Sequence, residues 1–189
     1  DSIPCTLWNA EDKSTKSNLG IVADDFGINA NKIENIKYID TKEGIKEWLD
    51  ILEIENYTVK QDLTVGVNGN VNLNNKNLSN IPIQFGTVKG YFDCSRNNLT
   101  SLKGSPQKCR DFYCYNNNLI SLEYAPEKCE YFDCSRNNLT SLKGSPQKCL
   151  YFDCNHNKLT KEYLSNFDFS FVKRKLFTDY DDINGKFKK

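Results

Sequence analysis

The chain has 189 residues, and its 25 Lys and Arg are balanced by 25 Asp and Glu, so no net charge points to a nucleic acid or a membrane surface as partner. It contains no run of 18 or more apolar residues that could span a bilayer. Its first residues, DSIPCTLWNAEDK, lack the charged and apolar regions of a secretory signal, but the chain has no Met, so its first residue does not identify where the protein begins.

Residues 1–70 are expected to form a small α/β segment that caps the N-terminal end of the remaining chain. Within it, Leu19–Ala23 and Asn35–Ile39 have the composition of short strands. The rest of residues 1–40 shows no recognisable pattern, and Cys5 stands alone there.

The next stretch predicts a helix followed by a hairpin. TKEGIKEWLDILEI predicts a helix over about residues 41–54, with Thr41 as N-cap and Ile45, Trp48, Leu49 and Leu52 on one face. In DLTVGVNGNVNL, Asn-Gly separates two alternating runs, which predicts a β-hairpin over about residues 63–73.

Residues 71–159 are an array of repeated units with a constant spacing. The phrase YFDCSRNNLTSLKGSPQKC occurs at Tyr91–Cys109 and again, unchanged, at Tyr131–Cys149. The recurring positions include Phe92, Phe112, Phe132 and Phe152; Cys94, Cys114, Cys134 and Cys154; Asn97, Asn117, Asn137 and Asn157; and Leu99, Leu119, Leu139 and Leu159. VNLNNKNLSNIP, from Val71, fits as an atypical first unit, giving an array of about five units.

The repeat predicts stacked turns with one strand each. In FDC, the Phe and the Cys lie two residues apart and point inward, while the Asp points outward. Stacked units would form a parallel sheet over a continuous core. The Asn after each strand is expected to turn the chain and to form a ladder through Asn97, Asn117, Asn137 and Asn157.

Residues 160–189 are expected to form a C-terminal cap and tail. Thr160–Asn166 predicts a short helix, and DFSFVKRKLF supplies apolar residues that can cover the last turn. The acidic DYDDINGKFKK does not match a calcium-binding loop, because its Gly is misplaced and the closing Glu is missing.

The unit reads as L-x-x-L-x-L-x-x-N-x-L-x-x-L with Cys, Phe and Cys in the first three Leu positions, which is the pattern of short leucine-rich repeats. Gly44–His156 also resembles leucine-rich-repeat proteins encoded by bacteria and phages, which carry runs similar to Trp48–Thr58, Val65–Leu73 and Ile81–Val88 before D-C-S-x-N-x-L-T-S-L repeats. The resemblance implies an α/β, β-rich leucine-rich-repeat solenoid with one parallel strand per repeat, a small α/β N-terminal cap and a short C-terminal cap. The ubiquitin-ligase domain of similar pathogen effectors has no place in the roughly 30 residues after the array.

The seven repeat cysteines stand where other units have Leu or Val, so we expect them to be reduced thiols in the core. Disulfides and a metal site are the alternatives. A ladder of strand cysteines offers no unique pairing, and C-x4-C spacing along a stack does not bring metal ligands to one point. Reduced thiols suggest a cytoplasmic protein.

The outward strand positions are expected to form a concave face that binds another protein. Tyr and Arg are typical of interface hot spots. The candidate residues are Tyr91, Asp93, Arg96, Asp111, Tyr113, Tyr115, Tyr131, Asp133, Arg136, Tyr151, Asp153 and His156. A solvated sheet is the plainer interpretation. Nucleic acid is disfavoured because the Asp residues would repel phosphates. His156 is the only His and has no Ser or Cys partner in sequence that would suggest a general base.

From these residues we expect a non-enzymatic protein-binding module, monomeric or a small oligomer, with no catalytic residue, cofactor, metal or membrane partner. The resemblance implies a phage- or bacterium-encoded factor that inhibits a host defence protein in the host cytoplasm. One alternative is a structural component that assembles by self-association. The other is an enzyme or nucleic-acid binder that uses residues 1–40, where Asp24 and Asp25 would hold a metal.

Overall fold

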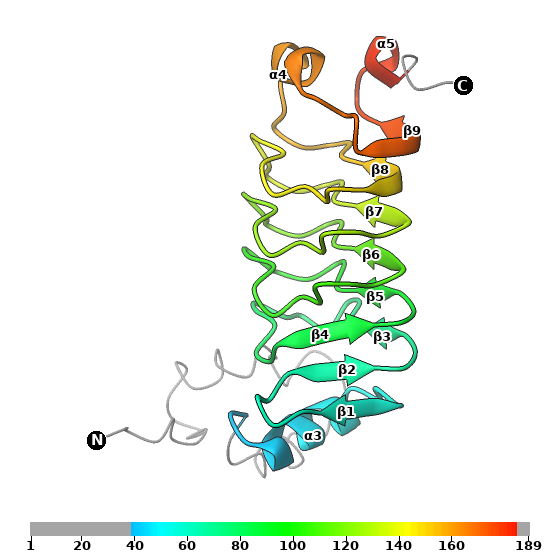
Figure 1. Ribbon diagram of the computed structural model, residues 1–189. Helices are drawn as coiled ribbons and strands as arrows, with labels where there is room; N and C mark the ends of the chain where they lie inside the picture. Colours follow the sequence, from blue (N-terminus) through cyan, green and yellow to red (C-terminus); the bar gives the residue numbers. More distant parts are fainter. Residues whose placement is uncertain (1–38, 185–189) are drawn as a thin grey trace, which may run out of the picture.

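The computed structural model describes residues 39–184 as a column of stacked turns (Figure 1). The strands of a six-stranded sheet run up one side of the column, those of a three-stranded sheet lie across the front of the view near its N-terminal end, and connecting loops run up the other side. In chain order the elements are α3 (Lys42–Ile51), β1 (Tyr57–Val59), β2 (Val65–Val67), β3 (Val71–Asn72), β4 (Phe85–Val88), β5 (Phe92–Asp93), β6 (Asp111–Tyr113), β7 (Tyr131–Asp133), β8 (Cys149–Asp153), α4 (Lys161–Asn166), β9 (Val172–Phe177) and α5 (Asp181–Asn184).

Helix α3 closes the N-terminal end of the column, as the sequence predicts. Thr41 is the N-cap, and its hydroxyl accepts a hydrogen bond from the Gly44 N–H at 3.1 Å. Ile45, Trp48 and Leu49 are buried against the first strands. The helix therefore covers apolar surface that the lowest turn would otherwise expose.

The predicted hairpin at residues 63–73 is wrong in its position. The antiparallel pair is β1 with β2, whereas β3 belongs to a different sheet and pairs in parallel with β5. Asn68 and Gly69 form a corner instead: the Asn68 N–H donates to the Asn56 carbonyl, and the Gly69 carbonyl accepts from Gly90 N–H at 2.8 Å. Both alternating runs are real strands, but they do not pair with each other: β2 pairs with β1 and β4, and β3 pairs with β5.

Six strands form one parallel sheet in the order β3-β5-β6-β7-β8-β9. The register pairs Phe92 with Phe112, Phe112 with Phe132, and Phe132 with Phe152. Their buried rings stack with centroids 5.4 to 5.6 Å apart. Such stacking adds stabilisation beyond burial alone. The fold is thus a parallel β-solenoid of about six turns, with one strand per turn in this sheet and repeats of about 20 residues.

The cysteines are part of this core. All seven within residues 39–184 are free thiols, and all but the partly buried Cys129 are buried. Burial raises the pKa of Cys109 to about 12, and it raises the pKa values of Cys94, Cys114 and Cys134 well above the ordinary value of a thiol. These groups are therefore protonated thiols that pack as small hydrophobes.

The asparagines that follow the strands form a ladder of hydrogen bonds. The Asn117 side chain donates to the Cys94 carbonyl at 3.0 Å and to the Cys114 carbonyl at 3.1 Å, and its oxygen accepts from Leu99 N–H at 3.0 Å. Asn137 repeats the pattern one turn later. Each amide therefore joins two turns and satisfies backbone groups that strand pairing leaves over.

The C-terminal cap does more than cover the last turn. Helix α4 begins after Thr160, as expected, but β9 also continues the parallel sheet beyond the predicted end of the array at residue 159. Phe171 lies edge-on against Phe152, with centroids 5.2 Å apart. Within residues 39–184, none of the helices has the length and hydrophobicity needed to span a bilayer.

Two groups of expectations fall on parts of the chain that the structure does not describe. The strand at Leu19–Ala23, nearly all of that at Asn35–Ile39, Cys5 and the pair Asp24 and Asp25 precede the described residues, and the tail after residue 184 follows them.

Candidate functional site

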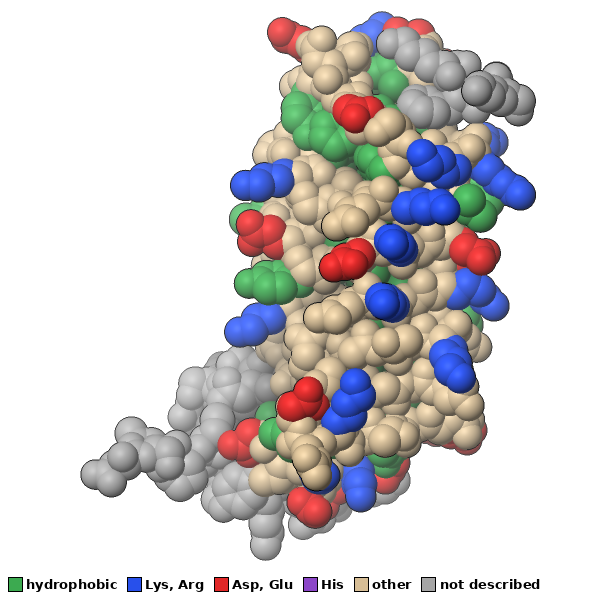
Figure 2. Space-filling view, in the orientation of Figure 1, with side chains coloured by type: hydrophobic (Ala, Val, Ile, Leu, Met, Phe, Trp, Pro, Cys, Tyr) green, Lys and Arg blue, Asp and Glu red, His purple; other side chains and the backbone are tan. Residues whose placement is uncertain are grey.

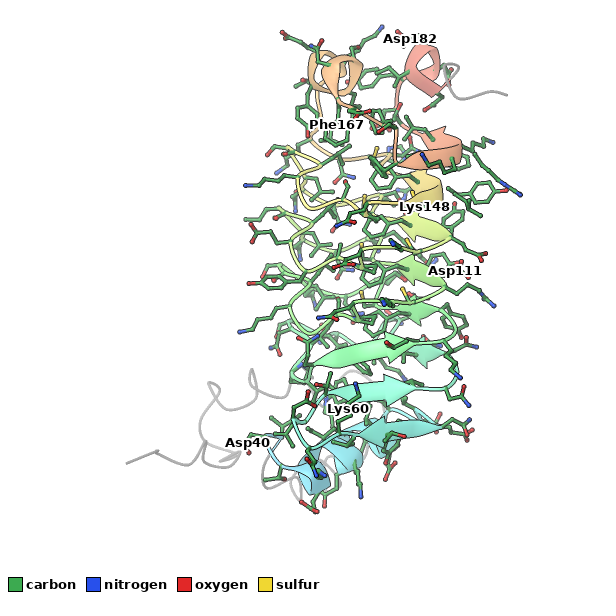
Figure 3. The ribbon with its side chains drawn as sticks, viewed as in Figure 1. Asp40, Lys60, Asp111, Lys148, Phe167 and Asp182 are labelled. Atoms are coloured by element: carbon green, nitrogen blue, oxygen red, sulfur yellow. The ribbon has the colours of Figure 1, made fainter. Side chains whose placement is uncertain are left out.

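The parallel sheet presents an outer face that carries one Tyr and one Asp on each of four successive strands. The buried Phe of each strand points into the core, so the residues on either side of it point outward. We call this surface the outer sheet face and define it by Tyr91 and Asp93, Asp111 and Tyr113, Tyr131 and Asp133, and Tyr151 and Asp153; all eight are partly buried. In Figure 3, Asp111 points away from the column on the strand side.

The tyrosines form a continuous ladder. Ring centroids are 6.5 Å apart for Tyr91 and Tyr113, 5.7 Å for Tyr113 and Tyr131, and 5.8 Å for Tyr131 and Tyr151. The ladder zigzags because β6 reads Asp-Phe-Tyr where β7 reads Tyr-Phe-Asp. Burial, followed by the charges of Asp133 and Asp153, raises the pKa of Tyr131 to about 12. Its hydroxyl is therefore a neutral donor at physiological pH.

Three carboxylates on this face are held in fixed positions by the turns that follow them. Oδ1 of Asp93, Asp133 and Asp153 accepts the backbone N–H two residues later, at 2.9, 2.9 and 3.0 Å. These bonds orient the carboxyl groups before any partner arrives.

Burial raises the pKa of Asp133, and it raises that of Asp153 to about 6. Neighbouring carboxylates add to both shifts, Asp93 for Asp133 and Asp133 for Asp153, and hydrogen bonds from the following turn oppose them. Asp133 and Asp153 stand side by side in the sheet register, so the charges of these two half-buried groups repel each other.

Asp111 differs from the other three because it has a cation. Arg110 Nε lies 2.8 Å from Asp111 Oδ2, and the Arg110 side chain is largely exposed. No ion pair joins Asp93, Asp133 or Asp153 to a cation of residues 39–184.

The remaining candidates lie at the corner that follows each strand. Arg96, Arg136 and His156 are exposed and have φ near 54°, as does Asn116, which holds the same position in its unit but is not a candidate. The Arg96 guanidinium lies 5.7 Å from the Tyr115 ring centroid, and His156 Nδ1 lies 3.3 Å from Asp179 Oδ1. The predicted set therefore divides into the outer sheet face and this corner, where Arg96 helps to line an asparagine-rich hollow of about 630 Å³.

Sequence reasoning missed two surface features. Lys108, Lys128 and Lys148 form parallel bridges in register, and Figure 2 shows a column of Lys and Arg running up the face in view. Ile120 and Tyr124 are 68% and 60% exposed, in the return segment of the divergent unit. The sequence could have indicated the exposed Ile120 and Tyr124, because the two identical units have Thr and Gly at these positions.

The described residues contain no group of three or more His, Cys, Asp or Glu arranged to hold a metal ion. Comparison with protein-family models, with curated proteins and with solved structures gave no significant match to this chain.

Proposed function

We propose that the chain is a non-enzymatic protein-binding module of the short leucine-rich-repeat type and that the outer sheet face is its binding surface. The repeat identity is supported by the Leu, Asn and Pro positions that recur from unit to unit and by the asparagine ladder they build. The single observation that carries the proposed function is the tyrosine ladder with one carboxylate per strand.

A sheet that only faces solvent needs no aromatic ladder. Tyr has a large rigid ring with a polar end, and it is enriched where proteins bind other proteins. On this surface the rings are held by their neighbours in the ladder and the carboxylates by their turns. Binding would therefore order few side chains, which lowers its entropic cost.

The resemblance to bacterial and phage proteins narrows the proposal. The partner would be a host protein, such as a defence protein, bound and inhibited in the host cytoplasm. Such inhibition requires only that the module cover a surface its target needs.

The test is affinity capture from a bacterial lysate with three purified forms of the chain: the natural sequence, Tyr113→Ala and Asp133→Lys. A protein captured by the natural sequence and lost with both variants is the expected result. Glu123→Lys, a matched charge reversal at an exposed site in the return segment, is the control that should still capture it. Thermal melts should show that all forms remain folded.

Equal capture by the natural sequence and both face variants would overturn the assignment of this surface. Light scattering after size exclusion, performed on the same samples, would show a concentration-dependent oligomer if self-association were the function instead.

A further inference from the structure

We propose that the outer sheet face takes an extended, basic segment of the partner protein, with Lys or Arg side chains lying on the tyrosine ladder and pairing with Asp93, Asp133 and Asp153. This inference rests on the proposed function, because it names the chemistry of the partner for the same surface.

The aromatic rings provide the first half of a cation site. The face of a tyrosine ring attracts Lys and Arg through its quadrupole. At the margins of this surface the molecule already uses such contacts internally. The Arg96 guanidinium lies 5.7 Å from the Tyr115 centroid, and Lys175 Nζ lies 4.5 Å from that of Phe177. Between these margins, the rings of the ladder carry no such contact with a cation of residues 39–184.

The carboxylates provide the second half. Asp93, Asp133 and Asp153 flank the rings, are oriented by their turns, and have no ion pair within residues 39–184. A partly buried carboxylate beside another carboxylate is stabilised by an arriving cation, because the cation relieves both desolvation and repulsion. Asp111, on the same face, is already stabilised by a cation in this way, through its ion pair with Arg110.

The sign of the charge excludes two other occupants. A phosphate backbone would meet the carboxylates as like charges. A second copy docking by the same face would place Asp residues against Asp residues, which is unfavourable for the same reason. A basic segment is the occupant whose charge complements the surface.

The repeat spacing sets the length scale of the segment. Neighbouring strands lie about 4.8 Å apart, so Asp93 and Asp133, two strands apart, are separated by about 10 Å. An extended chain advances about 10 Å in three residues. A segment that runs along the column would therefore place basic residues three positions apart against Asp93 and Asp133. Asp153 lies on the strand next to Asp133, so it would share the second of these cations. Arg174 and Lys175, on β9 beside Tyr151, limit the site to strands β5 to β8.

The experiment measures binding of fluorescent 12-residue peptides to the full chain by anisotropy, at pH 7.5 and low salt. One peptide has Arg at every third position with Ala and Ser between, and a second has the same composition with its four Arg contiguous. We expect the spaced peptide to bind more tightly than the contiguous one. The double variant Asp133→Asn with Asp153→Asn should weaken its binding at least tenfold, as should Tyr113→Ala with Tyr131→Ala.

Two control variants change other parts of the surface. Glu123→Gln removes an exposed acid from the return segment, and Ile120→Thr with Tyr124→Gly restores the residues of the two identical units. Neither should change the affinity.

Peptide binding should also weaken between pH 7.5 and pH 5 as Asp153 gains a proton. The charged or titratable groups that act on Asp153 are Asp133, Asp179 and His156, and the β9 residue beside it is Phe177. The Asp153→Asn variant, which should lose most of this pH dependence, therefore identifies its source.

The outcomes separate this inference from the proposed function. If the face variants abolish capture of a lysate protein but leave peptide affinity unchanged, the surface is correct and its assigned partner chemistry is wrong. Equal affinity for spaced and contiguous peptides would overturn the extended geometry. If the Asn variants leave the peptide affinity unchanged, the proposed role of the carboxylates is wrong.

Discussion

Asp153 carries its negative charge in a place that disfavours it. Burial and the adjacent Asp133 raise its pKa to about 6, and only its bond to the Asn155 N–H and the nearby His156 oppose the shift. A structural role alone would be filled equally well by Asn, whose side-chain oxygen could accept the same bond. The negative charge of Asp153 is therefore not needed for this bond.

We predict that Asp153→Asn stabilises the protein at neutral pH. A raised carboxyl pKa means that the folded protein binds more protons than the unfolded chain between about pH 4 and 6, so stability falls as pH rises through this range. A shift of about two units corresponds to at most ~3 kcal/mol, and solvent screening of this partly exposed group reduces the expected gain to about 1 kcal/mol.

Urea unfolding of both forms at pH 7.5 and pH 4 measures this effect. The variant should be the more stable form at pH 7.5 and equal to the natural sequence at pH 4. A loss of stability at pH 7.5 would show that the charge itself supports the fold.

At the scale of the elements, the corner after each strand depends on one buried amide. Asn117 joins the Cys94 and Cys114 carbonyls and accepts from Leu99 N–H, so it fixes two turns at once. The residue before it, Asn116, adopts φ 54°, a conformation that L-residues seldom adopt and that Asn tolerates best. Arg96, Arg136 and His156 adopt it too, at some energetic cost. The ladder of amides supplies the hydrogen bonds that hold them there.

We predict that Asn117→Ala destabilises the protein by about 2 to 4 kcal/mol, because it leaves a buried N–H and two buried carbonyls without this partner. Asn118→Ala is the matched control: its side chain is exposed, and the same loss of an amide there should cost less than ~0.5 kcal/mol. Chemical unfolding followed by circular dichroism compares the two. Equal, small effects would mean that water replaces the ladder's bonds.

At the scale of the whole molecule, each turn contacts mainly the turns above and below it. The registers of β5 to β8 are the same from strand to strand, and the Phe stack, the cysteines and the asparagines repeat with them. Helix α3 closes one end of the column, and β9, the Phe-rich segment before it and helices α4 and α5 close the other (Figure 1). Stability in such a stack is approximately a sum over turns and the interfaces between them.

This organisation predicts that the column can be lengthened. A second copy of residues 109–148, inserted after Lys148, creates almost only interfaces that the natural protein already has, because Tyr91–Cys109 and Tyr131–Cys149 are identical. The new junction differs in two residues, with Cys129 and Glu130 in place of Lys89 and Gly90. We expect a folded protein about 10 Å longer, with a steeper denaturant dependence of unfolding. Small-angle scattering and urea unfolding measure both. An unfolded product would show that contacts beyond neighbouring turns control the fold.

The sequence by itself determined the repeating part of this protein. Local spacing is enough to predict the period, the inward Phe and Cys, the outward Tyr and Asp and the asparagine ladder, because every repeat meets the same neighbours. Local patterns also predict the helices that flank the repeats. Tertiary structure decided what local patterns leave open. Asn68-Gly69 has the chemistry of a hairpin turn, yet it became a corner because β2 and β3 each pair with the next turn. DFSFVKRKLF could be recognised as a cap, but only the free edge of β8 made it a sheet strand. Tertiary structure also divides the candidate residues into a sheet face and a corner, and it raises the pKa of Asp153. Both results depend on burial and on residues of the adjacent turns, which the sequence of a single repeat does not specify.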